Sequence, residues 1–239
     1  MKADNLTADH FIEIYTSQAG AYHRMIAPED VDGNLLPAIE TITSLRGKRI
    51  LDLGTGSGRL PLLFGAQAGQ VVGLDLHAAM LAEHQRRRKQ RGGRWGLLQA
   101  DMRRLPLPNG WAEVVIAGWA IGHLVGWYGD RWHSEVQQVL AEMQRLVAPG
   151  GALIILETLS TGSLIPRPPT DGLARYYDWL ETDLGFKRQA IRTDYQFHSV
   201  DEAVARMAFF FGPELARTIR DQGWARVPEW TGVWGRLAI

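Results

Sequence analysis

Short apolar runs that alternate with helical segments constrain the fold of this chain more than any other feature of its sequence. Five such runs follow one another from residue 49 onward, and each has the length of a buried strand. Strands that are buried on both faces and joined by helices are typical of a parallel sheet. The pattern therefore predicts an α/β fold with strands at residues 50–53, 71–74, 97–100, 114–117 and 153–156.

Helical segments lie between and before these strands. The clearest crossover helix is predicted over residues 134–147, behind a capping box formed by Ser134 and Gln137. Residues 6–19 and 35–45 precede the first strand and do not belong to the repeating unit. We expect these two helices to lie across the carboxyl edge of the sheet as a cap.

The segments after the fifth strand predict a helical insertion and two further strands. A capping box at Ser199 and Glu202 begins a helical pair, which Gly212-Pro213 interrupts. Prolines and glycines separate the other segments. In chain order we expect a loop at 162–172, a helix at 173–184 ended by Gly185, an extended stretch at 187–197, the helical pair up to Gly223 and a last strand at 227–239.

Composition and charge exclude several classes of protein. The chain has 26 Lys and Arg against 26 Asp and Glu, which does not favour binding to DNA or to an anionic membrane. The absence of Cys excludes disulfides, thiolate zinc sites and a cysteine nucleophile. The histidines lack metal-ligand spacing with carboxylates, and residues 1–10 hold no apolar run of signal-peptide length. We therefore expect a cytoplasmic protein without a metal, in which the basic run at 86–89 ends a helix in solvent instead of binding RNA.

The segment 50–60 combines a strand, a glycine turn and the start of a helix, which is where an open α/β sheet binds nucleotide-like ligands. Its spacing is Gly-x-Gly-x-Gly, and Arg59 holds the position of the third glycine in a dinucleotide fingerprint, which disfavours NAD. Asp75 ends the second strand, 75 − 54 = 21 residues after the first glycine, and is placed to bind ribose hydroxyls. Asp101 ends the third strand and is placed to accept a hydrogen bond from an adenine amino group. Together these residues predict an adenosine pocket.

These residues resemble the ordered motifs of the class I S-adenosylmethionine-dependent methyltransferases. The similarity extends from about residue 15 to about residue 158 and is greatest to the small-molecule branch that includes the quinone-biosynthesis type. Several motifs in the expected order make the resemblance specific. The motifs are Leu51-Asp52-Leu53-Gly54-Thr55-Gly56-Ser57-Gly58, Val72-Gly73-Leu74-Asp75, Gln99-Ala100-Asp101-Met102 and Leu146-Val147-Ala148-Pro149-Gly150-Gly151.

The resemblance implies a set of residues that bind S-adenosylmethionine. The three glycines would line its methionine part, Asp75 would hold the ribose, and Asp101 with the Met102 backbone would hold the adenine. Asp52 would steady the glycine turn or meet the methionine ammonium, and Tyr22 would close over the cofactor from the amino-terminal cap. The full cofactor-binding set is Tyr22, Asp52, Gly54, Thr55, Gly56, Gly58, Asp75, Leu76, Asp101, Met102 and Trp119.

The resemblance also implies the overall architecture. We expect one domain over residues 1–239, a Rossmann-like three-layer α/β/α fold with a seven-stranded, mostly parallel sheet whose last strand is antiparallel. Residues 1–46 would form the helical cap, 47–158 the cofactor-binding core, and 159–239 the insertion helices and the last two strands.

Methyl transfer to a small molecule is the expected reaction. His123, just after the fourth strand, is the candidate for a base, with packing or shielding of the cofactor as its alternative role. Trp119 and its neighbours Trp111, Trp127 and Trp132 either form an aromatic pocket for the acceptor or fill the core. A cofactor-binding protein without turnover and an NAD-dependent oxidoreductase remain the alternatives. The sequence identifies neither the acceptor nor the atom that is methylated, and it leaves the oligomeric state open.

Overall fold

A seven-stranded sheet forms the centre of the molecule in the computed structural model, which describes residues 7–238. The strand order is β3-β2-β1-β4-β5-β9-β6, and β9 runs antiparallel to both of its neighbours while the pairs from β3 to β5 are parallel. The predicted sheet with an antiparallel last strand is therefore confirmed. The strands are β1 Arg49–Leu53, β2 Gln70–Asp75, β3 Gly96–Gln99, β4 Ala112–Gly118, β5 Val147–Thr161, β6 Lys187–Arg192 and β9 Glu229–Leu237.

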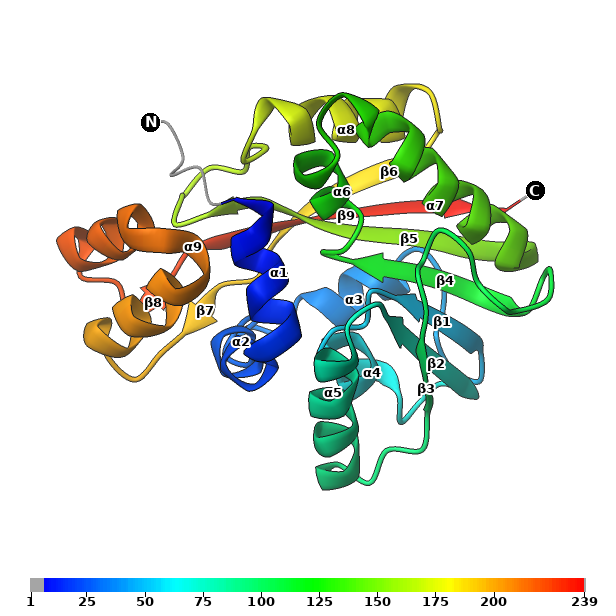
Figure 1. The fold of residues 1–239 in the computed structure, drawn as a ribbon, viewed down its shortest axis with the longest axis horizontal. Coiled ribbons are helices and arrows are strands. Elements are labelled where there is room, and N and C mark those ends of the chain that lie inside the picture. Colours follow the sequence, from blue (N-terminus) through cyan, green and yellow to red (C-terminus); the bar gives the residue numbers. More distant parts are fainter. Residues whose placement is uncertain (1–6, 239) are drawn as a thin grey trace.

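Helices cover both faces of the sheet (Figure 1). Neighbouring residues of β1 point to opposite faces: Ile50 packs with α3 and α4, whereas Leu51 packs with the core under α6, α7 and α8. This arrangement is the three-layer α/β/α fold predicted from the sequence. One face carries α3 Leu35–Glu40, α4 Arg59–Phe64 and α5 Ala78–Gln90, and the other carries α6 Gly122–Trp127, a 3-10 turn at Gly129–Arg131, α7 Trp132–Leu146 and α8 Asp171–Thr182.

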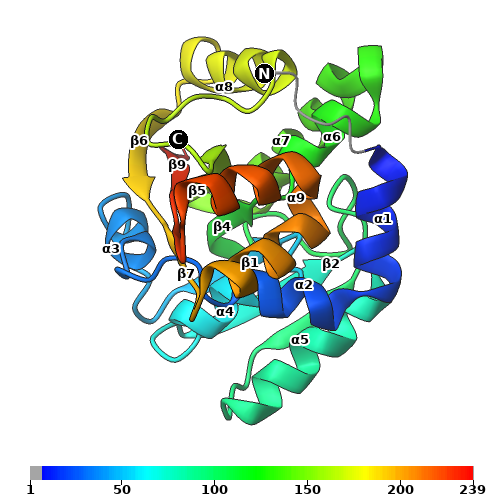
Figure 2. The same cartoon turned by 90° about the vertical axis from the view of Figure 1, so that its left-hand side faces the viewer.

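A helical cap lies beyond the carboxyl ends of the parallel strands. Figure 2 looks onto this end, where α1, α2 and α9 stand in front of the sheet. Met25 of α2 packs with Met207 and Ile219 of α9 in a small core separate from those on the sheet. The cap therefore joins segments from both ends of the chain. Its elements are α1 Ala8–Ser17, α2 Ala19–Ile26, α9 Val200–Gln222 and the two-stranded ribbon of β7 Tyr195–Gln196 with β8 Arg226–Val227.

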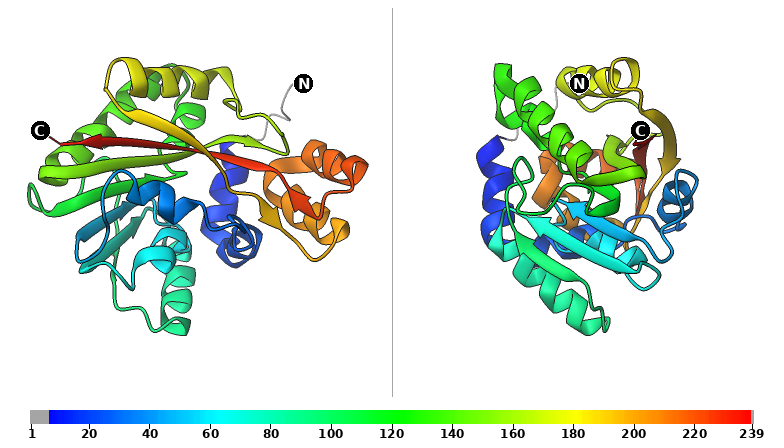
Figure 3. Two further views of the ribbon diagram at one scale, coloured as in Figure 1. Left: turned by 180° about the vertical axis from the view of Figure 1, so that it is seen from behind. Right: turned by 90° about the vertical axis from the view of Figure 1, so that its right-hand side faces the viewer.

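The helix predicted over residues 35–45 is not part of this cap. It spans Leu35–Glu40, and its buried residues Leu35 and Ile39 pack on the sheet with Ile50. The view from behind in Figure 3 shows α3 lying against the sheet itself. Sequence periodicity identified an amphipathic helix but does not say which of two apolar surfaces it will cover.

Two predicted helix boundaries also differ from the structure. The helix predicted over residues 6–19 ends at Ser17, and α2 follows at once; residue 6 lies outside the described residues. The capping box at Ser134 is wrong, because α7 begins at Trp132 and the Ser134 hydroxyl donates to the carbonyl of Arg131. A preceding 3-10 turn had already started the helical backbone, which no cap signal in the sequence reveals.

Half of the capping box predicted at Ser199 is confirmed. Ser199 caps α9, and its hydroxyl accepts a hydrogen bond from the Glu202 backbone N–H, whereas the Glu202 carboxylate accepts from the N–H of His198 and not from that of Ser199. The predicted interruption is present at Gly212, where φ is 83°, and α9 ends at Gly223 with φ of 66°. Both glycines adopt left-handed backbone that other residues disfavour. Among residues 7–238, no helix has the length and apolar character needed to span a membrane.

Candidate functional site

A cavity of about 750 Å³ lies between the carboxyl ends of the strands and the helical cap. Its floor is the glycine turn after β1 and the loop after β4, and its roof includes Tyr22 of α2 and Phe210 of α9. All predicted site residues line it except Gly58. The tertiary structure therefore brings together residues that the sequence spreads over a hundred positions.

Positive φ angles shape the glycine turn. Gly54 and Gly56 have φ of 65° and 52°, a conformation that costs a residue with a side chain about 1–2 kcal/mol. A Cβ on Gly54 would lie 2.4 Å from the Cβ of Ala120, so the loop after β4 crosses directly over the turn. The Thr55 hydroxyl donates to Asp52 Oδ2 at 2.5 Å, and burial raises the pKa of Asp52 to about 7. Asp52 thus steadies the turn, which is one of the two roles expected for it.

Gly58 does not line the cavity but packs the turn against a neighbouring helix. Its φ is 95°, and a Cβ there would lie 2.3 Å from Cδ2 of His84. His84 is completely buried, its Nε2 accepts a hydrogen bond from the Trp95 indole at 2.7 Å, and burial lowers its pKa to about 4. Sequence reasoning missed this neutral histidine because its partner lies on another element and no short motif joins them.

Two carboxylates at strand ends face the same cavity. Asp75 accepts hydrogen bonds from the backbone N–H groups of Gly56 and His77 at 2.9 and 2.8 Å. Asp101 pairs with Arg103 at 2.5 Å, and this guanidinium lowers the pKa of the carboxyl. Asp75 has lone pairs beyond those used here and can accept hydrogen bonds from hydroxyl groups of a ligand. Both Asp101 oxygens already accept from Arg103, through its backbone N–H, Nε and Nη2, so a ligand amino group would replace one of these contacts.

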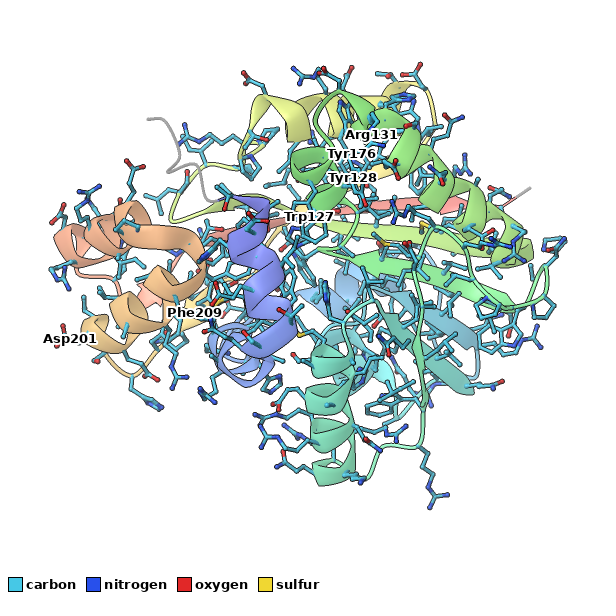
Figure 4. The ribbon with its side chains drawn as sticks, in the orientation of Figure 1. Trp127, Tyr128, Arg131, Tyr176, Asp201 and Phe209 are labelled. Atoms are coloured by element: carbon cyan, nitrogen blue, oxygen red, sulfur yellow. The ribbon has the colours of Figure 1, made fainter. Side chains whose placement is uncertain are left out.

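A hydrogen bond joins the cap to the predicted base. The hydroxyl of Tyr15 lies 2.9 Å from Nε2 of His123, and the His123 ring stacks on Trp127 with centroids 5.0 Å apart. Trp127 projects from the end of α6 toward α1 (Figure 4). Burial lowers the pKa of His123 to about 4, so the ring is neutral at pH 7. Tyr22 meets the Tyr15 ring edge-on at 5.5 Å and stands over the glycine turn.

The tryptophans divide between the cavity and the core. Trp119 has φ of 50°, lies under the Arg59 guanidinium at 4.0 Å, and lines the cavity with Trp127. Trp111 and Trp132 pack against the core beneath α7. Core filling is thus found for Trp111 and Trp132, while an acceptor pocket at Trp119 and Trp127 stays a prediction.

Buried glutamates form the part of the site that the sequence did not reveal. Glu29 pairs with Arg59 at 2.6 Å on the cavity wall, and burial raises the pKa of Glu29 and of its neighbour Glu229. Glu157 lies in the buried part of β5, accepts a hydrogen bond from Gly122 N–H at 2.7 Å, and has its pKa raised to about 8 by burial. Glutamate in or beside a strand carries no sequence signal of this kind, because only the fold shows which face it occupies.

These residues fit S-adenosylmethionine as the resemblance implies. A glycine turn that no Cβ could occupy gives close access to the backbone, and two strand-end carboxylates provide acceptors for ribose and adenine. The cavity holds no cluster of three or more His, Asp or Glu arranged for a metal ion, as far as residues 7–238 show.

Comparison with known proteins agrees with this geometry. Residues 51–155 match the family described as methyltransferase domain. The chain is 33% identical over 142 residues to demethylmenaquinone methyltransferase of Thermus thermophilus, which covers 59% of this chain and 57% of that protein. It is 31% identical over 146 residues to malonyl-[acyl-carrier protein] O-methyltransferase of Legionella pneumophila, which covers 59% and 46%. The chain spans about half the length of these curated relatives.

Solved structures show the same fold. A SAM-dependent methyltransferase from Aquifex aeolicus matches with a TM-score of 0.58 at 14% identity, over 98% of this chain and all of that one. A methyltransferase structure from Bacillus halodurans matches with a TM-score of 0.55 at 15% identity, over 86% and 97%. Family match and fold together show that residues 51–155 form a methyltransferase domain, with the fold seen in solved S-adenosylmethionine-dependent methyltransferases.

Proposed function

We propose that this protein transfers a methyl group from S-adenosylmethionine to a small-molecule acceptor by in-line displacement. The observation that carries the proposal is the single cavity in which the glycine turn, Asp75 and Asp101 meet an aromatic wall formed by Tyr15, Trp127 and Phe210. The first three features suit a nucleoside, and the wall suits a planar or apolar molecule.

The cofactor, when bound, supplies an already activated methyl group, so the protein's work is to bind, orient and exclude water. In this proposal Asp75 accepts the ribose hydroxyls, and Asp101 with the Met102 backbone and Leu76 surrounds the adenine. Gly54, Thr55 and Gly56 border the methionine part, and Tyr22 closes over it. Trp119 separates this part of the cavity from the acceptor.

The acceptor is proposed as a small molecule because of the cavity and the relatives. The relatives' own names specify demethylmenaquinone and malonyl-[acyl-carrier protein] as acceptors for those proteins. The basic run in this chain ends α5, and Arg86 and Arg87 pair with Glu83, which leaves less free charge for nucleic acid. The cytoplasmic location is likewise a proposal, tested by fractionating cells that produce the protein.

Calorimetric titration with S-adenosylhomocysteine tests the cofactor site. We expect one site per chain and a loss of affinity of about tenfold or more in Asp75→Ala, since a buried carboxylate that accepts ribose hydrogen bonds contributes about 1.5–3 kcal/mol. Glu113→Ala, at the opposite end of the sheet beside Lys48, is the control and should bind as the wild type does. NADH titrated in the same way should give no heat.

Binding alone does not establish turnover. Incubation with methyl-labelled S-adenosylmethionine and a panel of small acceptors separates an enzyme from a protein that only binds the cofactor. Binding of S-adenosylhomocysteine without label transfer to any acceptor would favour the non-catalytic alternative, and binding of NADH alone would favour the oxidoreductase.

A further inference from the structure

Glu157 is a buried carboxyl group in the wall of the cavity. It lies on β5, paired with Gly232 of β9, and it is 5% exposed. Within residues 7–238 no Lys or Arg forms an ion pair with it, and its one hydrogen bond comes from Gly122 N–H to Oε1. A buried glutamate of this kind is costly to the fold, which suggests a role beyond packing.

The Glu157 carboxyl lies against Gly122, the first residue of α6. A Cβ on Gly122 would lie 2.8 Å from Oε2, so this glycine permits the close approach. The ionisable side chains that face it are Tyr15 of α1 and Tyr176 and Tyr177 of α8, and burial raises all three tyrosine pKa values well above the usual range. These hydroxyls therefore stay neutral, and Glu157 is the group in this part of the cavity that gains or loses a proton near neutral pH.

His123 is less suited to that task. Its Nε2 is engaged by the Tyr15 hydroxyl, and its ring is fixed by stacking on Trp127. Its low pKa makes the neutral ring a weak base, whereas burial gives the Glu157 carboxylate a high proton affinity.

Resting on the methyl transfer proposed above, we propose that Glu157 is the proton acceptor of the reaction and that the acceptor is a molecule whose methylated atom carries a proton. The lone pair of an O–H or N–H group forms the new bond to carbon, and the electron pair of the broken carbon–sulfur bond stays on sulfur. The released proton passes to the Glu157 carboxylate and leaves to solvent with the product. Acceptors without such a proton, for example tertiary amines, do not need this step.

The Glu157→Gln variant distinguishes proton acceptance by Glu157 from its other role, the hydrogen bond that it accepts from Gly122 N–H at the start of α6. The amide oxygen still accepts the hydrogen bond from Gly122 but takes no proton at neutral pH. Glu214→Gln, a partly exposed carboxyl at the rim of the same cavity, is the matched control. The probes are 2-naphthol and N,N-dimethylaniline with S-adenosylmethionine, followed from pH 6 to 10.

We expect Glu157→Gln to reduce 2-naphthol methylation about 10²–10⁴-fold below about pH 8.5 and to remove its rise with pH there, where 2-naphthol itself is still protonated. The rate of N,N-dimethylaniline methylation and the affinity for S-adenosylhomocysteine should stay within about twofold of the wild type. The thermal unfolding midpoint at pH 6 should stay within a few degrees. An unchanged pH profile for 2-naphthol in Glu157→Gln, or loss of the profile in His123→Ala instead, overturns the proposal.

Infrared difference spectroscopy gives a readout that does not depend on turnover. The carboxylic acid band of a buried, protonated Glu157 should titrate between pH 6 and 10 in the apo protein and be missing only in Glu157→Gln. In the S-adenosylhomocysteine complex the band should shift on adding 2-naphthol; no band, or a band indifferent to 2-naphthol, contradicts the proposal. Failure of S-adenosylhomocysteine to bind the wild type is a different result, which overturns the proposed function itself.

Discussion

A single glycine shows how tightly the turn after β1 is packed at the residue scale. Gly58 combines φ of 95° with the van der Waals contact of a buried histidine. We predict that Gly58→Ala lowers the free energy of unfolding by about 2–4 kcal/mol, because both the left-handed backbone and the clash with His84 oppose it. Urea unfolding measures the change.

Gly92 provides the control for this prediction. Its φ is 66°, and a Cβ there would meet nothing within 4 Å, so Gly92→Ala should cost about 1 kcal/mol from the backbone alone. An equal loss of unfolding free energy in Gly58→Ala and Gly92→Ala would show that the clash with His84 does not destabilise the Gly58 variant.

The hydrogen bond between Tyr15 and His123 links α1 to α6 at the scale of whole elements. Tyr15 is buried in the cap, and His123 is half-buried after the fourth parallel strand. We expect Tyr15→Phe to weaken S-adenosylhomocysteine binding by roughly fivefold, as loss of about 1 kcal/mol predicts. Hydrogen exchange should quicken in α1 and stay unchanged in α7, which packs on the far layer; equal change in both helices would point to general loosening instead.

A break within α9 is a second feature at the scale of whole elements. Gly212 interrupts the helix where Phe210 and Phe211 turn toward the cavity, and Pro213 follows without a backbone N–H to lose. The break lets one helix serve both the outer core of the cap and the cavity.

Buried carboxyls govern the pH dependence of the whole molecule. Glu157 and Asp52 have pKa values of about 8 and about 7, above those of an unfolded chain. Between pH 6.5 and 8.5 the folded state therefore holds protons that the unfolded state has lost, and stability falls as pH rises. His123, His84 and His23, with pKa values of about 4, act in the opposite direction, and their effect fades by about pH 7.5 as the histidines of the unfolded chain lose their protons.

We predict that the apo protein loses about 2 kcal/mol of unfolding free energy between pH 6.5 and 8.5. Urea unfolding at several pH values measures it, and the double variant Asp52→Asn/Glu157→Gln should flatten the slope. A wild type that grows more stable over this range would mean that both carboxyls are ionised in the fold.

The sequence by itself determined the order of strands and helices and the positions of the glycine turn and of Asp75 at the strand ends. Alternating apolar runs specify a parallel sheet because both faces must be buried, and Gly54, Gly56 and Asp75 follow from the local geometry of a strand end. Those properties depend on residues close together in the chain, where spacing fixes geometry.

Only the tertiary structure decided what lies opposite these motifs. Residues 35–40 pack on the face of the sheet and not in the expected cap, and Gly58 lies against His84. Glu157 is buried in the cavity wall and has no ion pair with a Lys or Arg among residues 7–238. Each of these outcomes depends on contacts between segments far apart in the chain. Burial and the resulting proton affinity are properties of that packing, and no local pattern of residues contains them.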